Sequence, residues 1–106
     1  MNTSINNFDT IEKLIYEEGI RIEAIDFHPD MDLMLILLNT KAVLRQNLST
    51  YKLLSVAGKE ALQQYELIGN GTGVHWTLLD EDLSLKGFLR DELRNVVKSS
   101  DGKVAA

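Results

Sequence analysis

The 106-residue sequence has no cysteine and only one proline. The absence of cysteine excludes disulfides, thiolate zinc sites, iron–sulfur clusters and cysteine nucleophiles. Stability must then come from packing alone, which fits a reducing compartment. We expect one domain, because a chain of this length can bury a single core.

Long apolar segments are also missing. The longest apolar run covers residues 33–38, far short of the roughly 20 residues that cross a bilayer. The N-terminal segment MNTSINNFDT lacks the basic and apolar regions of a secretory signal. The sequence therefore predicts a cytoplasmic protein without a membrane segment.

Basic residues are in the minority, since 16 Asp and Glu outnumber 11 Lys and Arg and give a formal net charge of −5. An acidic domain is poorly suited to neutralise the phosphates of nucleic acid. Lys86, Arg90 and Arg94 nevertheless lie four residues apart on one expected helix face. Nucleic-acid contact there is a weaker alternative to a solvated face with ion pairs.

The first half of the chain predicts an N-terminal extension and a three-stranded antiparallel meander. In the extension, residues 1–19, Asp9 or Thr10 is expected to cap a short helix that runs through Glu18 and is stopped by Gly19. The first strand carries Ile20, Ile22 and Ala24 on one face. The apolar run is typical of a strand covered on both faces. Turns are expected at HPDMD and at Asn-Thr, between strands over residues 20–27, 33–38 and 42–48.

The second half predicts short helices, a second hairpin and a C-terminal helix. The segment GNGTG is a strong hairpin signal. The strand after it places Trp76 in the core and His75 on the opposite face. Ser84 is a good N-cap for an amphipathic helix that runs to about Lys98. We therefore expect one α+β domain over residues 20–98, followed by a disordered tail over residues 99–106.

Three carboxylates, Asp80, Glu81 and Asp82, come just before Ser84. Negative charge at this position stabilises a helix N-terminus, which is the structural interpretation of the triplet. The functional alternative is a metal- or ligand-binding, enzyme-like domain. Its candidate binding residues are His75, Trp76, Asp80, Glu81 and Asp82.

A metal ion at this site could recruit further ligands from the HPDMD turn, because His and carboxylate groups suit zinc, manganese or iron. The additional candidates are His28, Asp30 and Asp32. The chain has no His-Glu-x-x-His segment or other strong ligand spacing. We therefore assign no metal, no cofactor and no catalytic residue, and we expect a protein that is not an enzyme.

Two segments, LSTYKLL and YELIGNGTGVHWTLLDEDLSLKGFL, resemble a bacterial family called domain of unknown function 2442, DUF2442. The resemblance covers about residues 20–90. Thr77 stands where the family usually has proline, and Asn39-Thr40 stands where it commonly has a glycine-containing turn. The matching residues are Leu48, Ser49, Tyr51, Leu67, Ile68, Gly69, Gly71, Gly73, His75, Trp76, Leu79, Asp80, Glu81, Asp82, Ser84 and Leu89.

The resemblance implies a small α+β domain. Members of the family are often encoded beside a second small protein, in an arrangement similar to toxin–antitoxin pairs, with this family in the antitoxin-like position. From the residues themselves we expect a non-enzymatic protein-interaction module, whose partner is a small protein or a second copy of the chain. Leu33, Leu35 and Leu37 are the candidate partner face, because the run 33–38 has more apolar surface than one small helix can cover.

Overall fold

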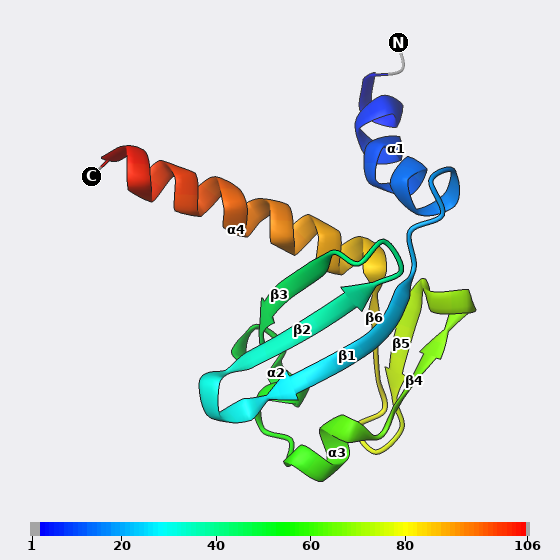
Figure 1. Cartoon of the computed structure of the whole chain (residues 1–106), viewed down its shortest axis with the longest axis vertical. Helices are drawn as coiled ribbons and strands as arrows, with labels where there is room; N and C mark the ends of the chain where they lie inside the picture. The colour runs from blue at the N-terminus through cyan, green and yellow to red at the C-terminus, as the bar shows by residue number, and fades with distance from the viewer. Residues whose placement is uncertain (1–2, 106) are drawn as a thin grey trace.

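The structure is a computed structural model that describes the backbone of residues 3–105 and the side chains of residues 10–97. It contains two three-stranded antiparallel sheets, with strand orders β1-β2-β3 and β4-β5-β6. The predicted α+β class is therefore confirmed (Figure 1). The elements are α1 (Thr3–Tyr16), β1 (Ile22–His28), η1 (Pro29–Met31), β2 (Leu33–Leu38), β3 (Val43–Asn47), η2 (Leu48–Thr50), α2 (Lys52–Ser55), α3 (Lys59–Gln63), β4 (Tyr65–Ile68), η3 (Gly69–Gly71), β5 (Gly73–Trp76), β6 (Glu81–Ser84) and α4 (Leu85–Ala105).

The predicted meander forms the first sheet, but the buried face of β1 differs from the expectation. Ile22 pairs with Leu38 and Ala24 pairs with Leu37, so Glu23 is an extra residue in the strand. Such a bulge reverses the alternation of side chains. As a result Ala24 leaves the face that Ile22 occupies, and the core receives Ile22, Ile25 and Phe27.

The strand β2 is covered on one face, not on both as its apolar run suggested. Met34, Ile36 and Leu38 are buried, whereas the alternate positions 33, 35 and 37 are partly or fully exposed. The turn HPDMD becomes η1, as predicted, and the loop after β2 closes the β2–β3 hairpin. Asn39 in that loop also donates its side-chain amide to the carbonyl of Gly19 at 2.9 Å.

The second sheet contains one strand more than the predicted hairpin. The segment DEDLS, expected as a charged lead-in to the helix, forms β6 and pairs with β5. Ser84 still caps α4, since its Oγ accepts a 3.0 Å hydrogen bond from the amide of Gly87. The acidic triplet therefore belongs to a turn and a strand, where Asp80 has a left-handed φ of 51°.

The two terminal helices are longer than predicted. α1 begins at Thr3 and α4 continues to Ala105, through residues for which the sequence predicts a disordered tail. Only the first part of the apolar stripe of α4 is buried, at Leu85 and Phe88, while Leu93 is 55% exposed. Among the described residues, no helix is both long enough and apolar enough to cross a membrane.

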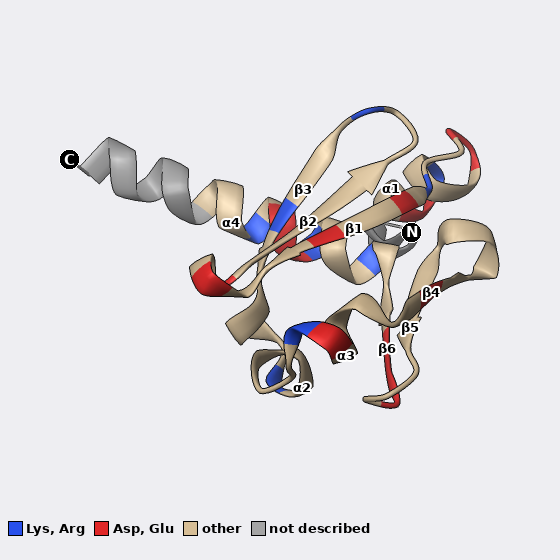
Figure 2. Cartoon of the chain, turned by 60° about the horizontal axis from the view of Figure 1, so that its bottom comes forward, with Lys and Arg blue, Asp and Glu red and all other residues tan. Residues whose placement is uncertain are grey.

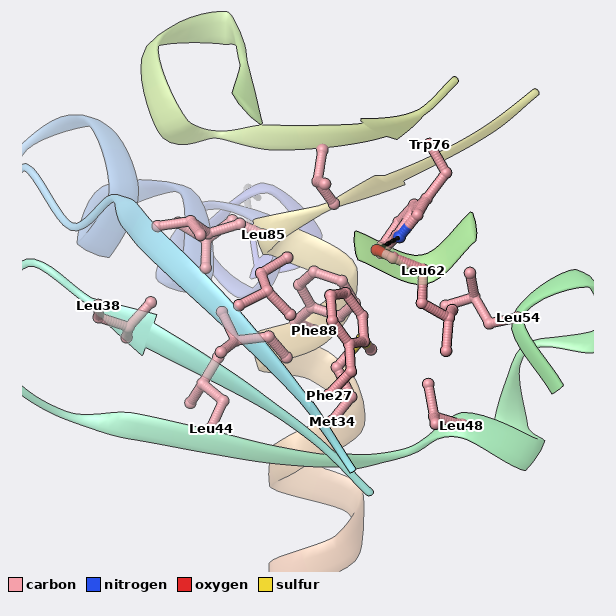
Figure 3. Close-up of a cluster of buried hydrophobic side chains, with 14 of the residues drawn as sticks. Phe27, Met34, Leu38, Leu44, Leu48, Leu54, Leu62, Trp76, Leu85 and Phe88 are labelled. Carbon is pink, nitrogen blue, oxygen red and sulfur yellow. Dashed lines mark hydrogen bonds between the residues drawn. The ribbon is translucent and has the colours of Figure 1, made fainter. Parts of the chain in front are cut away.

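One hydrophobic core lies between the sheets and the first turns of α4 (Figure 3). Trp76 is fully buried, as predicted, and its indole Nε1 donates a 3.1 Å hydrogen bond to the carbonyl of Leu62 in α3. Phe27 and Tyr65 make edge and tilted ring contacts with the indole. The indole therefore contacts residues of α3, β1 and β4.

Candidate functional site

The solvent-facing side of the first sheet carries an apolar row on its central strand. Leu33, Leu35 and Leu37 alternate with the buried residues of β2, so all three side chains point away from the core. An antiparallel sheet with one solvated face normally presents polar residues there. This row breaks that rule, and Val43 of β3, 50% exposed, pairs with Leu37 and extends it.

Polar residues flank the apolar row on both sides. Strand pairing places Asp26 of β1 and Arg45 of β3 on either side of Leu35, so the three residues form one line across the sheet. We call the nine outward positions of the three strands the outer face. It consists of Ala24, Asp26, His28, Leu33, Leu35, Leu37, Val43, Arg45 and Asn47.

The two flanks of the outer face differ in charge (Figure 2). Asp26 is exposed on β1, where its Oδ2 lies 2.8 Å from Nε2 of His28. The side chain of Arg45 is exposed on β3 and makes no ion pair within the described residues. In Figure 1 no helix crosses in front of the three strands. The outer face is thus a partly exposed apolar row with Asp26 on one side and Arg45 on the other, and Oε1 of Glu92 in α4 accepts a 3.2 Å hydrogen bond from the backbone amide of Arg45.

The predicted binding cluster is divided between the two faces of the second sheet. Nδ1 of His75 lies 2.5 Å from Oδ1 of Asp82, its cross-strand neighbour, while Trp76 points into the core. Glu66 is the neighbour of His75 on the other side. Of the predicted residues, the structure therefore brings His75 and Asp82 together, and Glu66 is an addition that the sequence did not indicate.

This row of charges makes the imidazole more basic. The hydrogen bond with Asp82 is the largest cause that raises the pKa of His75 above its usual value. The charges of Asp82, Glu66 and Asp80 act in the same direction, and partial burial opposes them. The second sheet accordingly presents a His–carboxylate pair in an acidic surrounding.

The candidate metal ligands of the HPDMD turn and those around Asp80 do not come together in one site. His28 pairs with Asp26, and Asp32 is occupied with Ser49: its two carboxylate oxygens accept from the amide at 2.8 Å and from the hydroxyl at 2.6 Å. Among the residues that the structure describes, no three His or carboxylate side chains are placed to hold a metal ion. Asp32 thus serves to fix the chain after η1.

The basic face of α4 is largely neutralised by carboxylates. Nζ of Lys86 lies 3.1 Å from Oε2 of Glu12 in α1, and Nη1 of Arg94 lies 3.5 Å from Oδ1 of Asp91. Arg90 has no ion pair in the described part of the chain. Two of the three cations are therefore already engaged with carboxylates.

A groove of about 610 Å³ lies between α1, the η3 turn and the first turns of α4. Ile15, Tyr16 and Phe88 contribute apolar lining, and the Glu12–Lys86 ion pair lies within it. Its remaining charged lining has both signs, from Asp82, Arg90 and Asp91. The Glu12–Lys86 ion pair thus joins the two helices. Because the lining carries charges of both signs, the groove favours neither an anionic nor a cationic ligand.

A polar network behind β3 is a further feature that the sequence did not indicate. Gln46 is buried on the core side of β3, and its Oε1 lies 2.6 Å from the hydroxyl of Tyr51. The same hydroxyl lies 3.0 Å from Oδ2 of Asp91. Burial raises the pKa of Tyr51, and the hydrogen bond with Asp91 raises it further. The network therefore connects β3, the segment after it and α4.

The alternation of residues in β3 could have predicted that Gln46 is buried and that Arg45 points outward. Leu44 and Gln46 are buried while residues 43, 45 and 47 are exposed, which is a regular period of two. That pattern, combined with the pairing register of the meander, places Arg45 beside Leu35. No sequence signal identifies the Tyr51–Asp91 contact, since it joins residues 40 positions apart.

Residues 22–93 match the protein family described as "Protein of unknown function (DUF2442)". The chain belongs to this family. The match covers both sheets and the first two turns of α4, and it leaves out α1 and the end of α4. Comparison with curated proteins finds no match.

Two solved structures are similar to this member of the DUF2442 family. A protein of unknown function from Rhodospirillum rubrum is 25% identical, with a TM-score of 0.61 over 69% of this chain and 88% of that chain. An uncharacterized protein from Chromobacterium violaceum is 21% identical, with a TM-score of 0.63 over 87% of this chain and 81% of that chain. The second likeness concerns the fold alone.

Proposed function

We propose that this chain is a non-enzymatic protein-interaction module of the cytoplasm and that the outer face is its docking surface. The observation that carries the proposal is the row of Leu33, Leu35 and Leu37 on the solvent side of a central strand. Removing exposed apolar side chains from water favours association. Burial of the outward leucines under a partner would therefore contribute favourable free energy to binding.

The family resemblance adds a candidate for a heterologous partner. Relatives are often encoded beside a second small protein, and this chain would take the antitoxin-like position. Its net charge of −5 favours a basic partner, because complementary charge steers association. Within this proposal the neighbouring-gene product and a second copy of the chain are the two candidate partners.

Binding assays on strand variants test the proposal. In the double variant Leu35→Thr, Leu37→Thr two of the three leucines of the row become polar, while threonine keeps a high strand propensity. We expect co-purification with a partner, either an untagged copy or the neighbouring-gene product, to fall about tenfold, the loss of roughly 1.4 kcal/mol. Val56→Thr is the control, since Val56 is 80% exposed and lies outside the outer face.

Two results would contradict the proposal. One is partner recovery that stays unchanged when the row becomes polar. The other is the failure of the native chain to bind itself or the neighbouring-gene product. Far-UV circular dichroism of each variant confirms that the comparison involves folded proteins.

A further inference from the structure

The charges on the outer face are arranged so that they complement the same face of another copy. Asp26, Leu35 and Arg45 lie in one line across the three strands, with the acid on β1 and the base on β3. Below that line His28 and Asn47 flank Leu33, and above it Ala24 and Val43 flank Leu37. The apolar row is therefore central and the charges lie on opposite edges.

Face-to-face packing of two identical sheets requires a two-fold axis in the plane between them. An axis parallel to the strands exchanges the two edges of the sheet. Asp26 of one copy then lies over Arg45 of the other, twice, and the leucine row packs on the leucine row. An axis perpendicular to the strands instead places Asp26 over Asp26 and Arg45 over Arg45.

We propose that the partner of the outer face is a second copy of this chain, related by a two-fold axis parallel to β2, with reciprocal Asp26–Arg45 ion pairs across the interface. This inference rests on the proposed function and names its partner. The arrangement is an aligned sheet-on-sheet packing, in which the two sheets lie about 10 Å apart. Like charges directly opposite each other exclude the other axis.

The small size of the outer face limits the strength of the dimer. Three strands about 4.8 Å apart and six residues at about 3.4 Å each cover roughly 15 by 20 Å. That is below the roughly 800 Å² per partner of a standard interface. We therefore expect a weak, reversible dimer with a dissociation constant on the order of 10–100 μM.

Charge reversal tests the geometry directly. Sedimentation equilibrium from about 5 to 500 μM should give a dimer for the native chain. Asp26→Arg alone and Arg45→Asp alone should each weaken it at least about tenfold, because each places like charges in contact. Mixing the two single variants should restore dimerisation, since every Arg at either position then faces an Asp. The double variant should also dimerise with itself.

Matched controls come from α3. Glu60→Arg and Lys59→Asp change the net charge by the same amounts at exposed positions outside the outer face. Both should dimerise like the native chain. Asp26 and Arg45 are themselves exposed, so their replacement leaves the core intact.

Three results would overturn the inference: a native chain that remains monomeric at 500 μM, a dimer that both single reversals leave unchanged, or a mixture of single variants that stays monomeric. If the native chain is monomeric but binds the neighbouring-gene product, and the Leu35→Thr, Leu37→Thr variant does not, the inference fails and the proposed function stands. If that variant also changes nothing, both fail.

Discussion

An ideal Cβ placed on Gly71 would lie 3.0 Å from the carbonyl oxygen of Ile22. The turn that joins β4 to β5 therefore packs directly on the start of β1, and it connects the second sheet to the first. The same Cβ would lie 3.1 Å from Cβ of Arg21. Gly71 also has a φ of +89°, a conformation that other residues rarely adopt.

The first prediction concerns this contact. Gly71→Ala should destabilise the fold by about 1–3 kcal/mol, because the new methyl group meets backbone atoms and the residue keeps a strained φ. Urea denaturation followed by far-UV circular dichroism measures the change. Gly58→Ser is the control: Gly58 precedes α3 with a φ of −74° and has open space around it, so serine should be neutral or slightly stabilising. Equal losses in both variants would contradict the prediction.

The second prediction concerns Trp76, the only tryptophan of the chain. Because the indole is fully buried, its fluorescence should be blue-shifted and resistant to acrylamide quenching in the folded state. Trp76→Phe should cost about 2–3 kcal/mol of unfolding free energy, since it leaves the carbonyl of Leu62 without its donor and reduces the packed volume. Strong quenching in the native protein would show that the indole is open to solvent.

The third prediction concerns the single proton of the Tyr51 hydroxyl, which faces two acceptors. It can donate to Gln46 or to Asp91 at one time, but not to both. Tyr51→Phe should cost about 1–3 kcal/mol, because it leaves the buried Oε1 of Gln46 without a donor. Tyr16→Phe is the control and should stay within about 0.5 kcal/mol, since Tyr16 is 65% exposed. A cost for Tyr51→Phe no larger than that of the control would exclude this role for the hydroxyl.

The sequence predicted the meander, the GNGTG turn, the Ser84 cap and the burial of Trp76 because each has a local signal. It missed the bulge at Glu23, since a bulge is a property of the pairing between two strands rather than of either strand alone. It also missed β6, because carboxylates before Ser84 are equally typical of a helix cap. Local charge preference was overridden there by pairing with β5.

The leucines of residues 33–38 indicate the candidate face already in the sequence, because the apolar run has more surface than one small helix can cover. The structure supplies a different reason, which is the position of the leucines on the solvent side of β2. A continuous apolar run is typical of a strand covered on both faces. In the fold the same run has one buried side and one open side, so the surplus of apolar surface lies on the outer face. The charges of Asp26 and Arg45 became meaningful only once the register placed them beside Leu35.

The fourth prediction concerns the His75–Asp82 pair. The carboxylate raises the pKa of His75 in the folded state, so the protonated imidazole is favoured more in the fold than in the unfolded chain. The resulting stabilisation is fully present below the unfolded pKa of about 6.5 and disappears as the pH rises through the higher folded value. Asp82→Asn should therefore lower the pKa of His75 and should reduce stability more at pH 5.5 than at pH 8.5.

Proton NMR titration measures this pKa, and a His28→Gln background leaves His75 as the only histidine. Asp30→Asn is the control, because Asp30 is not among the groups that act on the imidazole, so that variant should leave the titration unchanged. The charges of Glu66 and Asp80 remain in the Asp82→Asn variant and should keep part of the elevation. An unchanged pKa in Asp82→Asn would mean that the 2.5 Å contact does not persist in solution.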